Sequence, residues 1–158
     1  MGERVTVFGA GAWGSTMAQV LHDAGNEVLL WGRSSEVVDE INGSHTNHKY
    51  LDGHVLPAEL RASSDLAEAF AFSTTYVLAI PAQQLRAMLA EWKPLVKPGA
   101  VVVSTLKGIE ISSQKRMTEI IEEMWGVSKV GVITGPNLAD ELVMRQPAGA
   151  VAAASTQE

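Results

Sequence analysis

A glycine-rich turn near the start of the chain constrains its fold more than any other feature. The sequence GAGAWG at positions 9–14 comes directly after the apolar run 5–8 and directly before an amphipathic segment over 15–24. This order of strand, glycine turn and helix matches the G-x-G-x-x-G unit that binds dinucleotides. Glycine turns alone are common, so the flanking strand and helix are what make this motif informative.

The three glycines of this turn are expected to have different roles. Gly9 allows a tight turn off the strand, Gly11 lets the backbone come close to a pyrophosphate, and Gly14 lets the helix pack against the strand. The helix N-terminus then presents free N–H groups and a partial positive charge to the phosphates. The turn therefore predicts a dinucleotide site.

The composition narrows the class of protein. The 158 residues fit one domain with a sizeable core, and 46% of them are hydrophobic. The absence of cysteine excludes disulfides and thiolate chemistry, and is compatible with a reducing cytoplasm, where we expect the protein to reside. A net charge of −6 argues against nucleic acid or an anionic membrane as the main partner. No apolar run is long enough to span a membrane, and no signal-peptide pattern opens the sequence.

Apolar runs recur along the chain, with helical stretches between them. The runs are continuous rather than alternating, which is typical of parallel strands covered on both faces, and lie at 5–8, 28–31, 76–80, 101–103, 130–133 and 150–153. Apolar residues at helical spacing occupy 17–24, 85–92 and 117–124, with Gly25, Pro94 and Gly126 just beyond them. We therefore predict an α/β fold over residues 1–158, a Rossmann-like, doubly wound, mostly parallel sheet with helices on both faces.

The connection from Gly43 to Leu60 has no regular pattern and contains His45, His48 and His54. A metal site is conceivable here. However, no cysteine accompanies these residues and the segment is typical of a loop, where solvated histidines are commoner than ligand sets at loose spacing. We predict no bound metal.

The end of the second strand bears on the choice of cofactor. In an NAD-specific site, a carboxylate near this point accepts hydrogen bonds from the ribose hydroxyls. The first carboxylate here is Glu36, whereas Arg33 offers a cation where a 2′-phosphate would lie and Ser34 offers a hydroxyl. This pattern favours NADP(H), although NAD(H) and a solvated surface arginine both stay open.

Three further segments follow predicted strands and should therefore share the edge where ligands bind. Lys107 comes after the run 101–103, where a lysine can hold a phosphate or polarise a carbonyl oxygen. Gly135 suits a helix N-cap, with the helix starting at the next residue, a proline, and Asn137 adds a polar side chain. Pro81 begins the helix after the run 76–80 and completes the rim. Taken singly, each of these features also fits an ordinary surface lysine or a well-capped helix.

Taken together, these segments resemble the N-terminal domain of bacterial-type NAD(P)-dependent glycerol-3-phosphate dehydrogenase. The resemblance rests on GAGAWG at 9–14, LLWGR at 29–33, NHKYLDG at 47–53, IPAQQLR at 80–86, LKGIE at 106–110 and GPNLADE at 135–141. GAGAWG is shared with many dehydrogenases, whereas the last two segments are much more specific.

The resemblance implies reversible hydride transfer between dihydroxyacetone phosphate and sn-glycerol 3-phosphate, which feeds phospholipid synthesis. It implies that the dinucleotide is held at Ala12, Trp13, Arg33, Tyr50, Lys107 and Ala139, and the substrate at Lys107, Gly135 and Asn137. Lys107 is the one residue to which we assign a catalytic role.

Two departures from the family accompany this resemblance. The family carries its proton-donating lysine in a helical C-terminal domain of comparable size, which this sequence does not include. In addition, the family often has Pro-Thr where this chain has Pro147-Ala148. Because residues 155–158 read as an S-x-x-E capping box that announces a further helix, we expect the chain to be a fragment of a longer polypeptide.

Two other functions stay open. A related dehydrogenase would act on another small hydroxy or keto acid, and the LKGIE and GPNLADE segments speak against it. A sensing module would bind NAD(P) without doing chemistry, and would need no lysine after the run 101–103.

Overall fold

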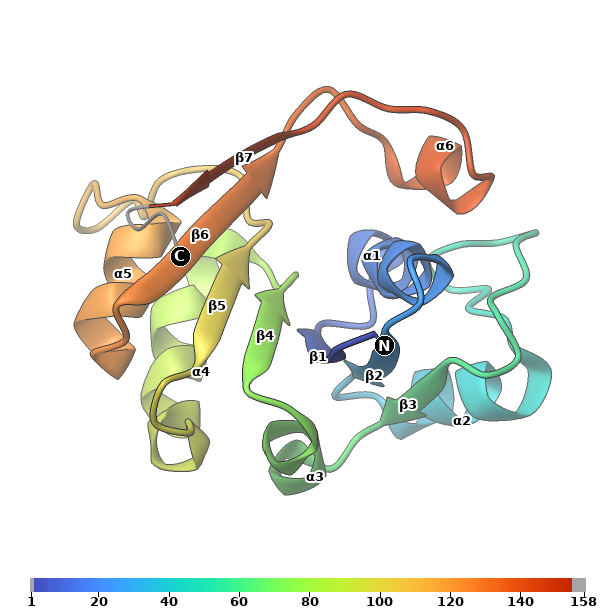
Figure 1. Ribbon diagram of the computed structural model, residues 1–158, viewed down its shortest axis with the longest axis horizontal. Coiled ribbons are helices and arrows are strands. Elements are labelled where there is room, and N and C mark those ends of the chain that lie inside the picture. The colour runs from blue at the N-terminus through green and yellow to red at the C-terminus, as the bar shows by residue number, and fades with distance from the viewer. Residues whose placement is uncertain (1, 155–158) are drawn as a thin grey trace.

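Seven strands form a single sheet in the computed structural model, which describes residues 2–154 (Figure 1). The strands are β1 Arg4–Phe8, β2 Glu27–Trp31, β3 Arg61–Ser63, β4 Thr75–Leu78, β5 Val101–Ser104, β6 Lys129–Thr134 and β7 Val151–Ala154. Their order is β3-β2-β1-β4-β5-β6-β7, and all neighbours are parallel except β6 and β7. The chain therefore winds in both directions from β1, and a crevice opens between the carboxyl ends of β1 and β4.

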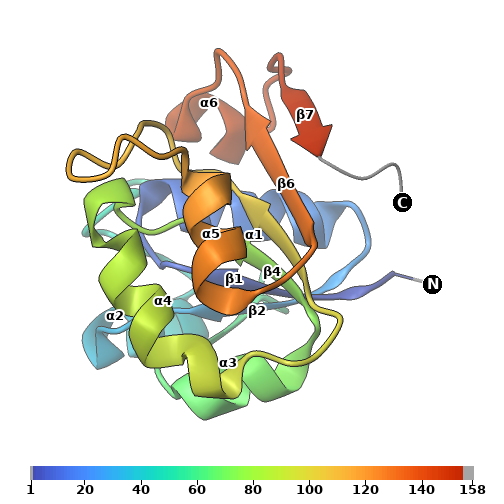
Figure 2. The same ribbon diagram turned by 90° about the vertical axis from the view of Figure 1, so that its left-hand side faces the viewer.

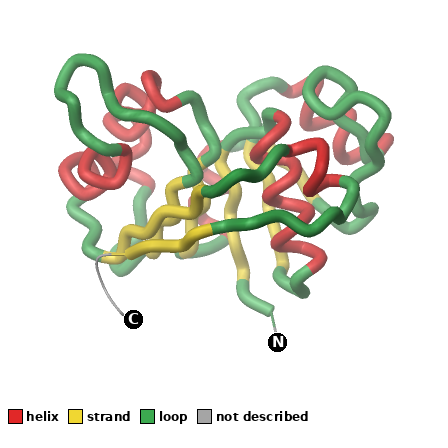
Figure 3. Tube along the Cα trace, turned by 90° about the horizontal axis from the view of Figure 1, so that it is seen from above, coloured by secondary structure: helices red, strands yellow, loops and turns green. Residues whose placement is uncertain are grey.

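Helices cover the sheet from two sides (Figure 3). Helices α1 Ala12–Asp23 and α2 Ser35–Ser44 pack on one face, and α6 Ala139–Val143 packs on α1. On the other face lie α3 Leu66–Phe72, α4 Leu85–Trp92 and α5 Met117–Trp125, with α4 and α5 in front of the strands in Figure 2. Two short 3₁₀ helices, η1 Ala82–Gln84 and η2 Lys93–Leu95, flank α4. The predicted Rossmann-like fold is confirmed.

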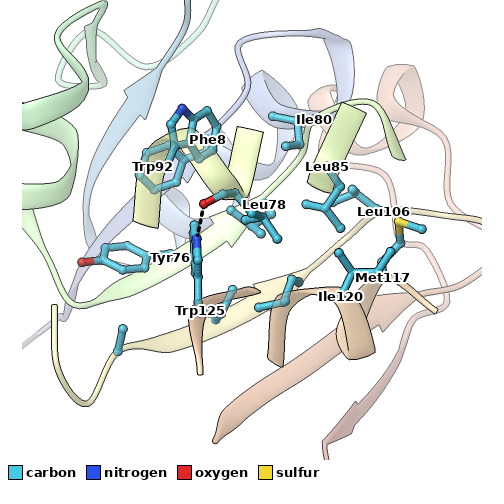
Figure 4. Close-up of a cluster of buried hydrophobic side chains, with 14 of the residues drawn as sticks. Phe8, Tyr76, Leu78, Ile80, Leu85, Trp92, Leu106, Met117, Ile120 and Trp125 are labelled. Carbon is cyan, nitrogen blue, oxygen red and sulfur yellow. Dashed lines mark hydrogen bonds between the residues drawn. The ribbon is translucent and has the colours of Figure 1, made fainter. Parts of the chain in front are cut away.

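Aromatic side chains fill the core beneath α3, α4 and α5 (Figure 4). The Phe8 ring lies 5.2 Å from that of Trp92 and 5.7 Å from that of Tyr76, centroid to centroid. The indole N–H of Trp125 donates to the carbonyl of Leu89 at 2.9 Å, so this buried polar group is satisfied and ties α5 to α4. Trp92 and Leu89 belong to the apolar stripe predicted over 85–92, whereas Trp125 lies one residue beyond the stripe predicted over 117–124.

At the end of the sheet formed by β5, β6 and β7, the described helices cover only one face. All four residues of β7 are exposed, and Val101, Val103 and Ile133 are half-buried on the face that α1 covers elsewhere. The expectation that apolar runs lie between two layers of helices therefore holds for β1, β2 and β4. It does not hold here for β6 and β7.

Several element boundaries differ from the prediction. Strand β3 and helices α2 and α3 were not predicted. Strand β3 has only three residues and mixes charge with apolar character. Gly43 lies inside α2, so the long connection begins at His45 rather than at Gly43. Gly126 ends α5 in the left-handed conformation, as predicted. The predicted capping box at 155–158 lies outside the described residues, and no described helix is long and apolar enough to cross a membrane.

Candidate functional site

The glycine turn after β1 is closed towards the sheet and open at its outer corner. Gly9 has φ +119°, and a Cβ on it would lie 2.4 Å from the carbonyl oxygen of Ala79. A Cβ on Gly14 would lie only 1.7 Å from the carbonyl oxygen of Gly9, so α1 packs against the turn as closely as glycine allows. By contrast, a Cβ on Gly11 would meet nothing within 4 Å. The backbone at Gly11 is thus accessible from the crevice.

Helix α1 begins at this open corner. Its N-cap is Gly11, which offers no capping side chain, and no acidic residue occupies its first turn. The first N–H groups of a helix lack partners within the helix, and the helix dipole adds partial positive charge. The N-terminus of α1 can therefore hold an anion.

A cleft of about 540 Å³ extends from this turn across the ends of β2 and β4. Eight of the predicted cofactor residues line it, namely Gly9, Gly11, Ala12, Trp13, Arg33, Ser34, Tyr50 and Pro81. Arg33 and Lys49 bring two cations to the lining, which contains no carboxylate. The volume is in the range of small-molecule sites, and the charge favours a ligand that carries phosphate.

The segment that carries Lys49 and Tyr50 is fixed to the glycine turn by a residue that the sequence analysis missed. Asn47 is fully buried and donates from Nδ2 to the carbonyl of Ala10 at 3.1 Å and to Oγ of Ser15 at 2.9 Å. Asn47 and Lys49 both belong to the matching segment NHKYLDG, where only Tyr50 was singled out. The burial of Asn47 becomes evident only in the fold, so its residue type alone gave no signal.

The neighbouring histidines do not converge. His48 hydrogen-bonds Glu40 through both its backbone N–H and its ring Nδ1, at 2.8 and 2.5 Å. Together with a bond from the Thr46 hydroxyl, these contacts lower the pKa of Glu40, the backbone bond most of all. Among residues 2–154, no three His, Cys, Asp or Glu side chains are grouped so that they could hold a metal ion.

A second cavity of about 410 Å³ adjoins the cleft at the ends of β4, β5 and β6. It shares Ala12, Trp13, Ala79 and Ile80 with the cleft, so the two form a continuous lining. Lys107, Asn137 and Ala139 line the second cavity. A ligand longer than either cavity could therefore extend from Arg33 to Lys107.

Lys107 meets the other two predicted substrate residues. Its Nζ lies 3.2 Å from the carbonyl oxygen of Gly135 and 3.4 Å from Oδ1 of Asn137. It also lies 5.8 Å from the centroid of the Trp13 ring, which joins the two cavities. Asn137 is buried, with its Nδ2 directed to the carbonyl of Gly149 at 3.5 Å. The predicted grouping of Lys107, Gly135 and Asn137 at one sheet edge is confirmed.

The prediction that Gly135 caps a helix starting at the next residue is wrong. Helix α6 begins at Ala139, with Leu138 as its N-cap. The N–H of Asn137 donates instead to the carbonyl of Gly135 at 3.0 Å, which makes a turn, and the Asn137 side chain contacts Lys107 and Gly149. Because α6 has only five residues, we assign no anion site to its N-terminus.

The remaining predicted residues are placed as follows. Pro81 precedes the 3₁₀ helix η1, and α4 begins only at Leu85. The prediction that Pro81 begins an α-helix is therefore wrong. Gly14 lines neither cavity and lies beneath the turn. Ala139 is held over α1, where its carbonyl accepts from Oγ1 of Thr16 at 3.4 Å.

Comparison with known proteins agrees with this geometry. A family model described as NAD-dependent glycerol-3-phosphate dehydrogenase N-terminus matches residues 4–158. Glycerol-3-phosphate dehydrogenase [NAD(P)+] of Streptomyces coelicolor is 49% identical over 152 residues, which are 95% of this chain and 45% of the relative. A Mycobacterium tuberculosis relative of the same name is 47% identical over 153 residues, 96% of this chain and 46% of the relative.

Solved structures give the same result. Glycerol-3-phosphate dehydrogenase from Coxiella burnetii superposes with a TM-score of 0.90 at 28% identity, covering 98% of this chain and 47% of that one. The Plasmodium falciparum enzyme superposes with a TM-score of 0.91 at 27% identity, covering 99% and 47%. The chain spans about half the length of the curated relatives it matches. With a match over residues 4–158, this chain belongs to the NAD-dependent glycerol-3-phosphate dehydrogenase N-terminus family.

Proposed function

We propose that this chain is the cofactor-binding half of an enzyme that interconverts dihydroxyacetone phosphate and sn-glycerol 3-phosphate with NAD(P)H, for glycerophospholipid synthesis. The observation that carries the proposal is the pair of continuous cavities, one at a phosphate-binding turn and one at Lys107. The relatives in Streptomyces and Mycobacterium are named for glycerol 3-phosphate and NAD(P)+, which supports this substrate and cofactor.

The dinucleotide would lie along the carboxyl edge of the sheet. Its pyrophosphate would rest on the N-terminus of α1 at Gly11, Ala12 and Trp13, where the open backbone and the free N–H groups suit an anion. From there the adenosine half would extend to Arg33 and Ser34, beside Tyr50 and Pro81, and the nicotinamide half towards Lys107 and Ala139. When bound, the cofactor supplies the hydride.

The lining of the cleft supports NADP(H) as the preferred form. Arg33 lies beyond the end of β2, where a 2′-phosphate would be placed, and no carboxylate lines the cleft to accept from a free ribose hydroxyl. Lys49 adds a second cation. Both cations favour an additional phosphate over a hydroxyl.

The substrate would meet Lys107 in the second cavity. The ammonium group has three N–H donors, and two are directed at the Gly135 carbonyl and at Oδ1 of Asn137. The third could donate to an oxygen of the substrate, whose negative charge the lysine would neutralise. Gly135 and Asn137 thus fix the charge in place before the substrate arrives.

The proton donor and the remaining substrate contacts would come from a C-terminal domain of the same polypeptide. The relatives are about twice as long as this chain, and among the described residues that line the second cavity, Lys107 is the one ionisable side chain. The lack of cysteine supports a cytoplasmic setting. Neither nucleic acid nor a membrane is proposed as a partner, given the acidic net charge.

Turnover of the full-length polypeptide tests the proposal. We expect NADPH-dependent reduction of dihydroxyacetone phosphate by the full-length protein and almost none by the 158-residue chain, because acid–base catalysis alone contributes about 10²–10⁴-fold. If the full-length protein binds NADPH but reduces no dihydroxyacetone phosphate, the sensing module or a dehydrogenase for another hydroxy acid is the correct function.

Substitution of Arg33 tests the cofactor preference. In Arg33→Glu the carboxylate would repel a 2′-phosphate and accept from a free ribose hydroxyl, so the ratio of NADPH to NADH affinity should fall by about tenfold or more. Lys49→Met, which removes the other cation of the cleft without adding a carboxylate, is the matched control and should lower the ratio less. An unchanged ratio in Arg33→Glu would make Arg33 a surface residue only.

A further inference from the structure

The loop that carries Lys107 has little regular structure of its own. It joins β5 to α5, and an isolated bridge between Ile109 and Arg116 is its one ladder contact among the described residues. Ile109 is 54% exposed and Ile111 is 81% exposed, so apolar burial does not anchor this part of the loop. A loop with so few buried contacts would open easily unless something else held it.

Arg86 of α4 binds this loop through the carboxylate of Glu110. Its Nε lies 2.9 and 3.1 Å from the two carboxylate oxygens of Glu110, and its Nη2 lies 3.0 Å from Oε2. Glu110 is only 6% exposed and also accepts from the hydroxyl of Ser113. The arginine and, to a smaller degree, the serine lower the pKa of Glu110, so the carboxylate stays charged. Such planar, two-pronged pairing fixes orientation as well as distance.

Gln83 holds the backbone on either side of the same carboxylate. Its Nε2 donates to the carbonyl of Ile109 at 2.9 Å, and its Oε1 accepts from the N–H of Ile111 at 3.1 Å. The amide thereby pairs with the loop as a neighbouring strand would. Gln83 and Arg86 together contact three consecutive residues of the loop, by both backbone and side chain.

Arg86 also contacts α5, which follows the loop. Nη1 of Arg86 donates to Oε1 of Glu123 at 2.9 Å, and Lys115 contacts the other oxygen of Glu123 at 2.6 Å. Arg86 therefore connects α4, the loop and α5. None of Gln83, Arg86 and Glu110 lines either cavity, so the network touches no proposed ligand.

We propose that Gln83, Arg86 and Glu110 are positioning residues, which hold the loop so that Lys107 meets Gly135 and Asn137. Lys107 lies only three residues before Glu110, and its ammonium must stay within about 3.4 Å of both partners to present its third N–H. A pair needed for stability alone could be replaced by apolar side chains, whereas a two-pronged ion pair fixes the direction of the chain. The proposal rests on the proposed function of Lys107, and it explains why the segments IPAQQLR and LKGIE occur together.

A double-mutant cycle in the full-length polypeptide tests this assignment. We expect Arg86→Met to lower kcat for dihydroxyacetone phosphate by roughly 10- to 100-fold, as a small misplacement of a catalytic group does, with little change in the Kd for NADPH. In a Lys107→Ala background, Arg86→Met should lower kcat no further, because it acts through Lys107. Gln83→Ala, which leaves the buried charge paired, should give a smaller loss of the same kind, and serves if Arg86→Met does not fold.

Amide hydrogen exchange supplies a readout that does not depend on turnover. In Arg86→Met and Gln83→Ala, the N–H groups of residues 107–111 should exchange faster, whereas those of β1 should not change. Arg61→Met removes an exposed ion pair with Glu68 beside β3, and as the control it should alter neither kcat nor exchange at 107–111.

The two proposals fail in different ways. If the wild-type protein shows no turnover but Arg86→Met speeds amide exchange at 107–111, the proposed reaction is wrong, whereas Arg86 still holds the loop. If turnover is present, and the losses from Arg86→Met and Lys107→Ala multiply or exchange at 107–111 is unaltered, the three residues do not position Lys107.

Discussion

The two ends of the binding edge are built in different ways. At the glycine turn, one contiguous unit, β1 with its turn and α1, forms a candidate anion site almost entirely from backbone. At the other end, Lys107 lies among side chains from the segments that follow β4, β5 and β6, which are far apart in the sequence. The first site requires that side chains be absent, and the second requires that several be present.

Because of this difference, the two ends should respond differently to substitutions. In the turn, a single added methyl group either collides with backbone or enters the crevice, so the effects of substitutions should be abrupt and local. At the Lys107 end, several polar contacts share the task, so each substitution should weaken the arrangement by degrees and in combination with the others.

The sharpest contrast lies between two glycines of the same turn. Gly14→Ala would place a Cβ 1.7 Å from the Gly9 carbonyl, and should cost about 4 kcal/mol or more of unfolding free energy. Gly11→Ala meets nothing within 4 Å, and should change stability by less than about 1 kcal/mol while weakening NADPH binding. Urea unfolding and NADPH titration of both variants check this. Equal stability loss in the two would contradict the close packing of α1 on the turn.

Lys107→Ala in the full-length polypeptide gives the next largest effect. We expect kcat/KM for dihydroxyacetone phosphate to fall by about 10²-fold, the loss typical of one electrostatic stabiliser. Lys129→Ala, at the opposite end of the parallel strands, is the control and should leave kcat/KM unchanged, since it is remote from both the cleft and the second cavity. A loss below threefold for Lys107→Ala would remove Lys107 from the mechanism.

The same contrast explains what the sequence could predict. The turn at 9–14 and the helices α4 and α5 follow from local patterns, because a strand, a glycine turn or an apolar stripe is written in consecutive residues. Strand β3 was not predicted, because three residues are too few to show a hydrophobic periodicity. The helix predicted after Gly135 is replaced by a turn, and the Asn137 side chain contacts Lys107 and Gly149, which are distant in the sequence.

Contacts between distant segments were the hardest to foresee. That Asn47 holds the glycine turn, or that Arg86 holds Glu110, depends on which loops the sheet order brings together. The sequence marked the Lys107, Gly135 and Asn137 group only because all three follow strands, and the resemblance to a family named them. The distances between these three residues could be known only from the folded structure.

The pH dependence of stability gives the smallest effect. Lys115 first, and then Arg86, lower the pKa of Glu123 to about 2, below its ordinary value of 4.5. A lowered carboxylate pKa stabilises the fold above the ordinary value, and this contribution is lost as pH falls from about 4.5 towards 2. The Tm of wild type should therefore exceed that of Glu123→Gln by a constant margin above about pH 5, and the margin should shrink below it. A margin that is undiminished at about pH 2 would show that charge is not its source.

We expect the two ends of the edge to bind separate parts of the dinucleotide, and 2′,5′-ADP probes one end alone. Titration of the 158-residue chain with this compound can be followed by the fluorescence of Trp13 and Trp31, which line the cleft. We expect the Kd to be the same in wild type and Lys107→Ala, and to rise by about tenfold or more in Arg33→Glu. If Lys107→Ala abolishes binding of 2′,5′-ADP while Arg33→Glu has no effect, the cofactor lies in the opposite direction across the sheet and the account is wrong.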